Sequence, residues 1–457
     1  MSYHIKHLPN LLLLPVLFTA FISCDDEASK METNVTEVPQ ELSDDELLDK
    51  VQYATFQYFW DGAEPNSGMA RERYHMDGHY PQDDRDVVTS GGSGFGLMAI
   101  IVGAERGFIS REEAVDRFDR IVNFLETAER YNGVWPHWMY GPTGETRPFS
   151  TQDDGADIVE TSFLVQGLLT VRQYLRNGSD RENEIADRID TLWRDVNWNW
   201  HTRNGEENVL LWHWSPNHEF GMNHPIYGYD ETLITYILAA SSPTHPIDPQ
   251  VYHEGWARGG DIALEDHEAY GYSLPFSHNG AVEFSGPLFW AHYSYLGLDP
   301  RNLEDEYGNF WDNNRNHSLI HYEYAKENPN NFAGYGEDLW GLTASYSVNG
   351  YRAHRPHGDD VGVITPTAAL SSFPYTPEES MKVLKNLYYT YHDETFGPFG
   401  FYDALSIEEN WFPQRYLAID QGPIVVMIEN HRSGLLWDLF MSSEEIQEGL
   451  DRLGFSY

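Results

Sequence analysis

The chain has 457 residues, of which 41% are hydrophobic, enough for a large buried core. Its 72 acidic residues outnumber the 29 Lys and Arg residues, which gives a formal net charge of −43. Nucleic acid and anionic membrane surfaces both require basic patches, so this charge excludes them as partners. Solubility explains most of the excess acid, because a binding site needs only a few carboxylates.

The first 24 residues are typical of a lipoprotein signal peptide. The apolar stretch 11–22 is too short for a comfortable membrane span. It ends in Phe21-Ile22-Ser23-Cys24, which resembles a bacterial lipobox, although Phe21 stands where an aliphatic residue is usual. We therefore expect lipidation of Cys24 and export to the outer membrane, with the lipid as the only membrane attachment. An ordinary cleaved signal is the alternative, and with one cysteine no intrachain disulfide is possible.

Residues 25–42 are polar and have no periodic apolar face, which predicts a flexible tether. No composition break or repeat divides residues 43–457, so we expect a single domain there. This domain opens with Ser43-Asp-Asp-Glu46, a capping box that predicts the start of a helix.

Helical spacing of apolar residues recurs along the rest of the chain. The predicted helices are 94–106, 110–130, 158–176, 180–196, 229–240, 281–292, 300–328, 335–345, 376–391, 420–431 and 443–453, with a short apolar stretch at 364–372. About a dozen helices without a strand–helix alternation predict an all-α fold. Antiparallel helix pairs that close a ring would form an (α/α)6 toroid, which periodicity alone does not separate from other all-α folds.

Short β signals interrupt the helices. The stretch 133–140 precedes a turn at 141–144, and 197–214 is predicted as a hairpin around Asn204-Gly205. Strand alternation in this hairpin would bring together Trp198, Trp200, Trp212 and Trp214. The glycine-rich stretch 91–96 lacks the lysine of a phosphate loop, so we interpret it as a turn with close helix packing.

Three segments place acids beside aromatic residues or glycines where a helix is predicted to begin. Segment 148–160 follows a short aromatic stretch, segment 223–231 ends in Asp230-Glu231, and segment 410–423 contains one acid before an apolar helix. The candidates in and near them are Asp153, Asp154, Asp157, Glu160, Trp135, His137, Trp138, Trp214, Glu231 and Asp420. Each acid also has a structural interpretation, because helix starts favour acids as caps and dipole partners.

In a toroid of paired helices, alternate helices run the same way, so their N-termini would open on one face and bring these acids together. The helix dipole lowers a carboxyl pKa, which suits a base, whereas a proton donor needs burial or a neighbouring carboxylate. Glu231 has Asp230 beside it and is the better donor. Glu337 and Trp340 belong to a segment of acids and glycines that could form a pocket wall. His213, His218 and His224 are too loosely spaced to predict a metal site.

The motifs at 90–96, 133–138, 153–167, 336–344 and 418–424 resemble those of the bacterial glucoamylase-like proteins, which include glycoside hydrolase family 144. The resemblance runs from about residue 43 to the C-terminus. It implies an (α/α)6 toroid and an inverting hydrolase that cleaves β-1,2-glucan to sophorose or short sophoro-oligosaccharides, without a metal or other cofactor. It also implies important acids at Asp153, Asp157, Glu231 and Asp420.

Two-carboxylate chemistry would make Glu231 the acid and Asp420 the base, acting through a chain of waters, with Asp157 as a further catalytic acid. The implied partner is a neutral glucan, and we expect a monomer. The alternatives are a glucan-binding lipoprotein without catalysis, a hydrolase of another linkage such as an α-glucan, and a polysaccharide lyase. A lyase is disfavoured because uronic acids call for basic residues.

Overall fold

The computed structural model describes residues 41–281 and 284–457, and Ser43–Tyr457 forms one compact unit. The expected signal peptide with Cys24, and residues 25–40 of the expected tether, lie outside the described residues. Among the residues that are described, no helix is both long and apolar enough to cross a membrane.

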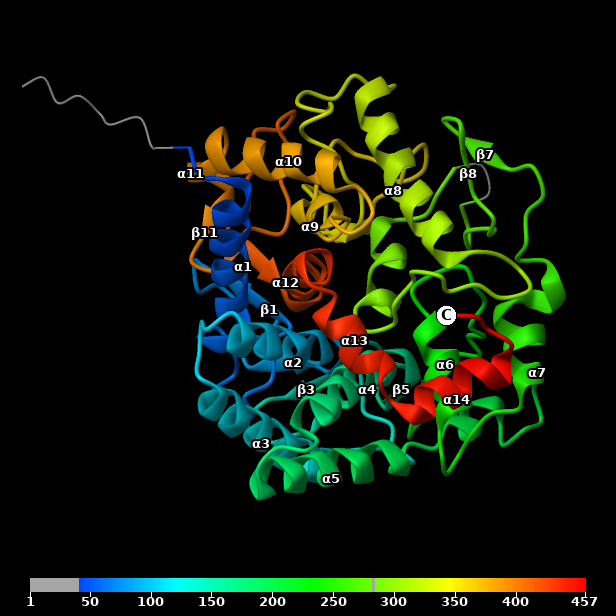
Figure 1. Ribbon diagram of the computed structural model, residues 1–457. Coiled ribbons are helices and arrows are strands. Elements are labelled where there is room, and N and C mark those ends of the chain that lie inside the picture. The colour runs from blue at the N-terminus through cyan, green and yellow to red at the C-terminus, as the bar shows by residue number, and fades with distance from the viewer. Residues whose placement is uncertain (1–40, 282–283) are drawn as a thin grey trace, which may run out of the picture. The chain divides into compact units, whose positions relative to one another are not determined.

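Helical segments of the Ser43–Tyr457 unit alternate along the chain between an inner and an outer layer (Figure 1). The inner layer is almost wholly buried, and in α6 every residue is buried. Its members are α2 (Ser90–Glu105), α4 (Ile158–Leu175), α6 (Leu233–Ser241), the 3-10 turns η4 (Leu288–Ala291) and η5 (Tyr293–Tyr295), α9 (Pro366–Leu370) and α12 (Ala418–Arg432).

The outer layer packs against this ring with one apolar face. It comprises α1 (Asp44–Trp60), α3 (Arg111–Thr127), α5 (Asp180–Asp195), α7 (Pro249–Val251) with the π-helical turn η2 (Tyr252–Trp256), α8 (Phe310–Glu327) and α10 (Pro377–Tyr389). The inner–outer alternation is that of an (α/α)6 toroid, as predicted. The remaining helical segments are η1 (Trp198–Thr202), η3 (Arg258–Gly260), α11 (His392–Thr395), α13 (Leu435–Met441) and α14 (Glu444–Leu453).

Capping boxes fix the starts of three outer helices. Ser43, Ser110 and Ser179 each accept a hydrogen bond from the backbone N–H three residues on, where a glutamate reaches back to the serine N–H. Inside the ring, glycines bring α2 and α4 into backbone contact. A Cβ at Gly94 would lie 2.0 Å from the Phe163 carbonyl oxygen.

Short strand pairs lie in the loops that enter and leave the inner helices, and all are antiparallel. The pairs are β1 (Arg73–His75) with β13 (Arg415–Leu417); β3 (Trp138–Tyr140) with β2 (Val87–Thr89) and β4 (Thr146–Arg147); β5 (Ala156–Asp157) with β6 (His213–Trp214); β7 (Glu268–Ala269) with β8 (Tyr272–Ser273); β9 (Ala344–Ser345) with β10 (Arg352–Ala353); and β11 (Phe396–Gly397) with β12 (Gly400–Phe401).

Several predicted elements are wrong in kind. Within 281–292, the described residues 281 and 284–292 form the 3-10 turn η4 and no α-helix, and 335–345 is loop with strand β9. The predicted 197–214 hairpin is instead η1 followed by a loop into β6, because Asn197 caps a 3-10 turn through the Trp200 N–H. The glycines of 91–96 lie inside α2 rather than in a turn, although their close packing was predicted.

Candidate active site

A cleft of about 1160 Å³ opens where the inner segments α2, α4, α6, η5 and α12 begin or are approached by their preceding loops. Its walls also include residues of β1, β3, β4, β10 and β13. The lining combines acidic, basic and aromatic side chains with a short turn, and includes Glu72, Arg73, His137, Trp138, Phe149, Glu160, Glu231, Tyr293, Tyr346, Ser347, Val348, Gly350, Tyr351 and Arg415. The N-termini of the inner helices therefore do converge on one face.

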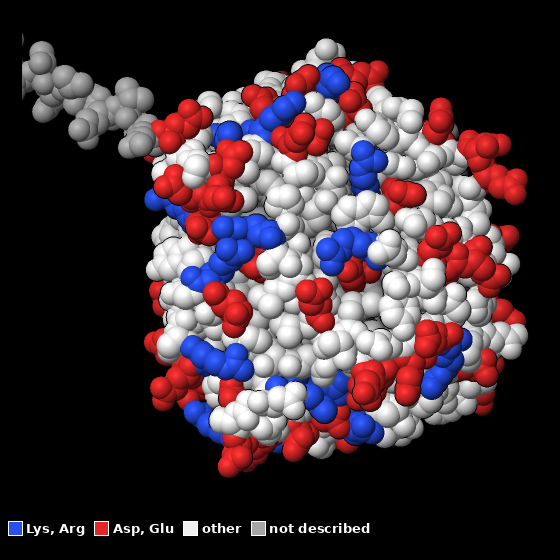
Figure 2. Space-filling view, viewed as in Figure 1, with Lys and Arg blue, Asp and Glu red and all other residues white. Residues whose placement is uncertain are grey.

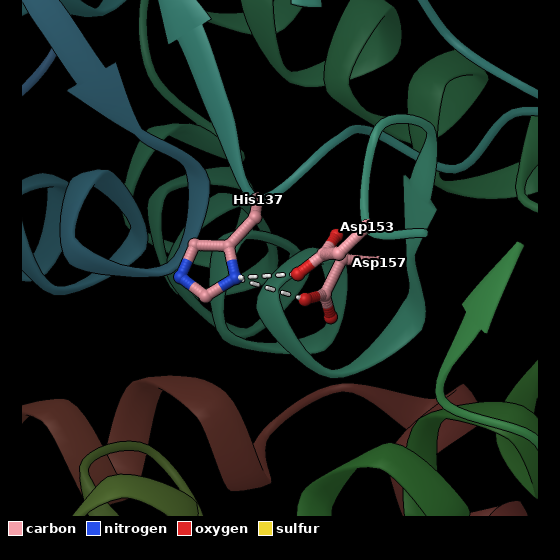
Figure 3. Close-up of side chains that lie close together, drawn as sticks. All are labelled: His137, Asp153 and Asp157. Atoms are coloured by element: carbon pink, nitrogen blue, oxygen red, sulfur yellow. Dashed lines mark ion pairs between the residues drawn. The ribbon is translucent and has the colours of Figure 1, made fainter. Parts of the chain in front are cut away.

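His137 lines this cleft and faces two buried aspartates, which lie side by side at one edge of its ring (Figure 3). Its Nδ1 is 3.1 Å from Asp157 and 3.6 Å from Asp153, and its Nε2 is 3.7 Å from Glu160. Burial opposes the charged ring, but Glu160, Asp153 and Asp157 outweigh it and raise the pKa of His137 well above its usual range. This shift favours the imidazolium form of the ring, which balances the negative charge of the neighbouring carboxylates.

Asp157 is fully buried and serves as the N-cap of α4. One carboxylate oxygen accepts hydrogen bonds from the N–H groups of Val159 and Glu160 and from Trp212 Nε1, while the other faces His137. Burial acts to raise the pKa of Asp157, but its contacts with His137 and His213 hold it below the ordinary value. Asp157 does not line the cleft, whereas His137, which it contacts, does.

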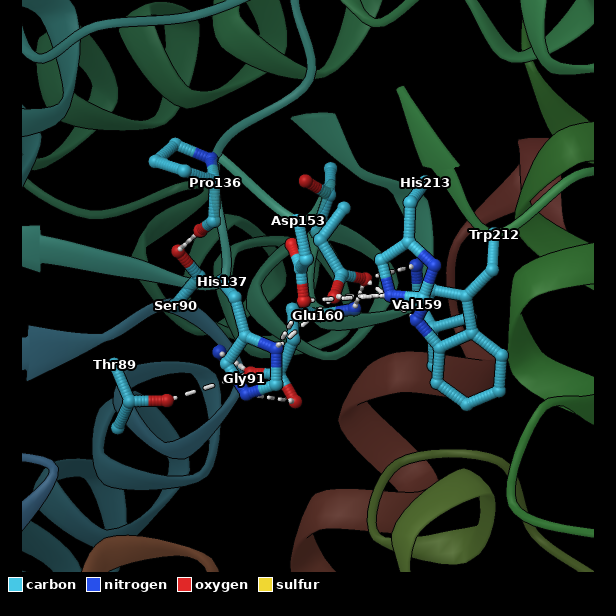
Figure 4. Close-up of polar contacts among 12 residues, drawn as sticks. Thr89, Ser90, Gly91, Pro136, His137, Asp153, Val159, Glu160, Trp212 and His213 are labelled. Carbon is cyan, nitrogen blue, oxygen red and sulfur yellow. Dashed lines mark hydrogen bonds and ion pairs between the residues drawn. The ribbon is translucent and has the colours of Figure 1, made fainter. Parts of the chain in front are cut away.

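Glu160 is in the first turn of α4 and reaches the cleft (Figure 4). It forms no capping box with Asp157, whose N–H donates instead to the Trp135 carbonyl oxygen at 3.0 Å. Its Oε2 accepts the Gly91 N–H at 2.8 Å and the Thr89 hydroxyl at 3.4 Å, which ties α4 to the start of α2. Burial raises the pKa of Glu160 to about 7.

Glu231 lines the cleft from the loop before α6. Because the helix begins only at Leu233, the predicted position of Glu231 in its first turn is wrong. Burial and the adjacent Asp230 raise the pKa of Glu231 well above its usual range. A carboxyl that stays protonated beside a ligand can donate a proton to it.

Asp420 is the third residue of α12 and is 1% exposed, behind the cleft wall. It is not the N-cap that the sequence suggested, since neither of its carboxyl oxygens has a hydrogen-bond partner among the described residues. Burial and the neighbouring Asp403 raise the pKa of Asp420 well above normal. The helix dipole was expected to lower this pKa, and burial outweighs it.

Comparison with known proteins bears on this arrangement of acids in a helical ring. A family model described as "Putative glucoamylase" matches residues 223–444. The solved endo-β-1,2-glucanase of Chitinophaga pinensis is 59% identical, with a TM-score of 0.90, and the match covers 91% of this chain and 99% of that one. The chain belongs to the glucoamylase-like family of glycoside hydrolases. Its (α/α)6 fold is the one shared by these proteins.

Parabacteroides distasonis provides two further relatives of this glucoamylase-like chain. The curated one, an exo β-1,2-glucooligosaccharide sophorohydrolase of the non-reducing end, is 44% identical over 427 residues. That match covers 90% of this chain but only 58% of the relative, so this chain spans less than two thirds of the relative's length. A solved β-1,2-glucanase is 43% identical, with a TM-score of 0.85, and covers 91% of this chain and 60% of that one.

The aromatic candidates of this glucoamylase-like protein divide into two groups. Trp138 and His137 line the cleft. Trp135 and Trp340 are fully buried, under Arg130 and against Tyr322 respectively, so placing them at the substrate was wrong. Trp214 packs against Tyr131 and Trp200, outside the cleft lining.

Two acidic candidates also lie away from the cleft. Asp154 accepts a hydrogen bond from the Asn217 amide at 2.7 Å and is absent from the cleft lining. Glu337 is exposed and forms an ion pair with Lys382 at 3.2 Å. Asp153, by contrast, is 4% exposed and contacts His137 beside the cleft.

Several residues of the cleft gave no clear signal in the sequence. Phe149 stacks on His137 with ring centroids 4.4 Å apart and is half exposed. Tyr351, at the end of the β9–β10 turn, lines the cleft, and so do Arg73 and Arg415 of the β1–β13 pair. His213, outside the cleft lining, approaches both aspartates, at 3.5 and 3.6 Å. Phe149 stands in segment 148–160, which the sequence marked for its acids, and Asn349-Gly350 before Tyr351 is a turn signal.

His137, Asp153 and Asp157 offer ligand atoms that all lie within 4.8 Å of one another, a spacing that could hold a metal ion. The three candidate ligand atoms come from one imidazole and two carboxylates, a donor set that suits a transition metal such as zinc.

Proposed function

We propose that this glucoamylase-like protein hydrolyses β-1,2-glucan and releases sophorose or short sophoro-oligosaccharides, with inversion at the anomeric carbon. The observation that carries the proposal is that Glu231, a carboxyl whose pKa is raised by burial and by Asp230, lines a cleft large enough for several sugar units. The near full-length similarity to the Chitinophaga endo-β-1,2-glucanase supports the choice of linkage.

In the proposed reaction, Glu231 donates its proton to the glycosidic oxygen as the bond breaks. A water attacks the anomeric carbon from the opposite face, and Asp420 receives its proton through bridging water, because Asp420 lies behind the wall. The imidazolium of His137 and the carboxyl of Glu160 hold sugar hydroxyls at the floor. Trp138 and Phe149, whose rings are 4.8 Å apart, provide apolar faces for sugar rings.

The test is a product profile of the purified protein against linear β-1,2-glucan, other β-glucans and α-glucans. New reducing ends and sophorose-series products from β-1,2-glucan alone are expected, and proton NMR of the fresh product should show the inverted anomer. Release of sugars from α-glucan instead would show that the protein cleaves an α linkage and not the β-1,2 linkage. Tight binding of β-1,2-glucan without new reducing ends would identify a binding protein, and an unsaturated product would identify a lyase.

We also propose that the protein is anchored through a lipid on Cys24. This rests on the lipobox-like Phe21–Cys24 sequence alone. In cells that express the chain, wild-type protein should fractionate with membranes, while Cys24→Ala should be lost from them with its glucanase activity unchanged. Membrane association that survives this substitution would refute the anchor.

A further inference from the structure

A second buried carboxyl lies behind the cleft next to Asp420. Asp403 follows strand β12 and is 2% exposed, whereas Asp420 is in the first turn of α12. The Asp403 N–H donates to the Arg415 carbonyl oxygen at 2.9 Å, which places Asp403 beside β13, the strand that leads directly into α12, and the two carboxyls interact with each other. No pattern in the sequence indicated Asp403, because it stands at neither a helix start nor a cluster of acids.

The hydrogen bonds around this pair are unevenly distributed. Asp403 Oδ2 accepts the Tyr346 N–H at 2.8 Å, which fixes the orientation of the carboxyl group. Asp403 Oδ1 and both oxygens of Asp420 have no donor among the residues that the structure describes. Two buried anions with three unpaired oxygens in contact would be strongly destabilising, whereas one proton between them removes the repulsion and supplies a hydrogen bond.

Positive charge near the pair does not take the place of that proton. The groups that face the two carboxyls are Glu72, Arg73, Tyr293, Tyr346 and Tyr351. Arg73, the cation in this set, is engaged with Glu72 and with Asp84, the latter at 3.3 Å. Arg415 stacks over the Tyr346 ring at 5.3 Å. A proton on the pair itself is therefore what reduces the negative charge of Asp403 and Asp420.

We propose that Asp403 is a positioning residue that shares a single proton with Asp420, so that the two carboxyls work as one base. This rests on the proposed function for its catalytic meaning. The shared proton holds one oxygen of Asp420 toward Asp403 and leaves the other to accept a proton from the water chain. The resting pair carries one negative charge.

The proton balance of the hydrolytic step follows directly. One O–H bond of the attacking water breaks, and its proton passes to Asp420 while the shared proton moves onto Asp403. The water oxygen bonds to the anomeric carbon, the glycosidic C–O bond breaks, and the leaving oxygen takes the proton of Glu231. The pair ends with two protons and Glu231 ends as a carboxylate, so total charge is unchanged.

The first experiment uses infrared spectroscopy of the protonated carboxyl band at neutral pH, and needs no substrate. Asp403→Asn and Asp420→Asn should each abolish the same single band, because either aspartate alone becomes an ordinary anion. The matched control is Asp305→Asn, another buried carboxyl, which accepts hydrogen bonds from the N–H groups of Tyr307 and Gly308. It should leave that band in place. Survival of the band in Asp420→Asn, or in both variants, would refute the proposal that Asp403 and Asp420 share one proton.

The second experiment measures turnover of linear β-1,2-glucan. Asp403→Asn should lower kcat by about 10²-fold with KM little changed, because it removes proton-accepting capacity and not a sugar contact. Asp305→Asn should retain kcat. Equal turnover by Asp403→Asn would refute the proposal, while an inactive wild type would refute the proposed function and leave the infrared result standing. If circular dichroism shows that Asp403→Asn does not fold, the infrared spectrum of Asp420→Asn tests the proposal. Loss of the carboxyl band in that variant supports the shared proton, and survival of the band refutes it.

Discussion

Carboxyl side chains at and beside the cleft have pKa values shifted in opposite directions. Asp157 remains an anion because His137 and three hydrogen-bond donors surround it. Glu231 remains protonated because it is buried beside Asp230. Environment rather than residue type therefore assigns acid and base here, as the pairing of a proton donor with a proton acceptor requires.

Glu231→Gln keeps the size of the side chain but removes the proton that the leaving oxygen must receive. We expect kcat on β-1,2-glucan to fall by about 10³-fold or more, with little change in thermal stability. Reducing-end assays and calorimetry measure the two quantities. The control is Glu184→Gln on the exposed face of α5, which should match wild type. Substantial turnover by Glu231→Gln would remove this residue from the role of proton donor.

His137→Gln leaves Asp153, Asp157 and Glu160 without their buried cation. Since the pKa of His137 is raised by folding, its contribution is complete below the unfolded value of about 6.5 and is lost as pH rises through the folded pKa. We expect the variant to be about 3 kcal/mol less stable at pH 6, with a smaller deficit in strongly alkaline solution, by urea unfolding.

His201→Gln is the matched comparison, because burial lowers the pKa of His201 to about 4. The neutral His201 ring contributes fully above about pH 6.5 and loses its contribution as pH falls toward 4. Relative to this variant, wild type should therefore lose stability on acidification, the opposite of the His137 case. The same trend in both variants would contradict the protonation state assigned to His137.

At the level of elements, local signals predicted the outer helices well. Capping boxes at Ser43, Ser110 and Ser179 fix where α1, α3 and α5 begin, whatever packs on them later. The inner elements were harder, because a segment buried on all sides shows no amphipathic period. The 3-10 segment around Tyr293 and the glycine start of α2 are formed by tertiary contacts that single-sequence patterns do not encode.

Gly94→Ala tests the backbone contact between α2 and α4. The added methyl would lie 2.0 Å from the Phe163 carbonyl oxygen, and a carbonyl of a packed helix cannot swing aside as a side chain can. We expect a loss of about 3 kcal/mol in unfolding free energy and disturbance of Glu160, which follows β5 into α4. Gly336→Ala, whose methyl would meet nothing nearer than 3.7 Å, should be neutral.

At the level of the whole molecule, ring closure explains which site residues the sequence revealed. Glu231, Glu160 and Asp153 stand near the starts of inner helices, which the toroid gathers on one face. Arg73, Tyr351 and Asp403 come from strand pairs and turns between helices, and their convergence depends on how the ring closes. Family motifs marked the first group, and only three-dimensional structure could place the second.

The net charge of −43 also acts on the molecule as a whole. Acidic side chains are spread over the face shown in Figure 2, with basic ones interspersed and no continuous basic patch on that face. Raising NaCl from about 10 mM to about 500 mM shortens the Debye length and weakens self-repulsion, so the thermal midpoint should rise. The KM for an uncharged glucan should not change. A falling midpoint would show that ion pairs outweigh repulsion.

The turn between β9 and β10 overhangs the cleft and is closed by paired backbone hydrogen bonds of Ser347 and Gly350. The turn lies outside the two helical layers of the toroid. An insertion or deletion in this turn during evolution would therefore make one wall of the cleft higher or lower, while α9 and α12 stayed in place. Substrate length preference, whether an enzyme trims chain ends or cuts within a polymer, can therefore diverge among relatives that keep the same acids.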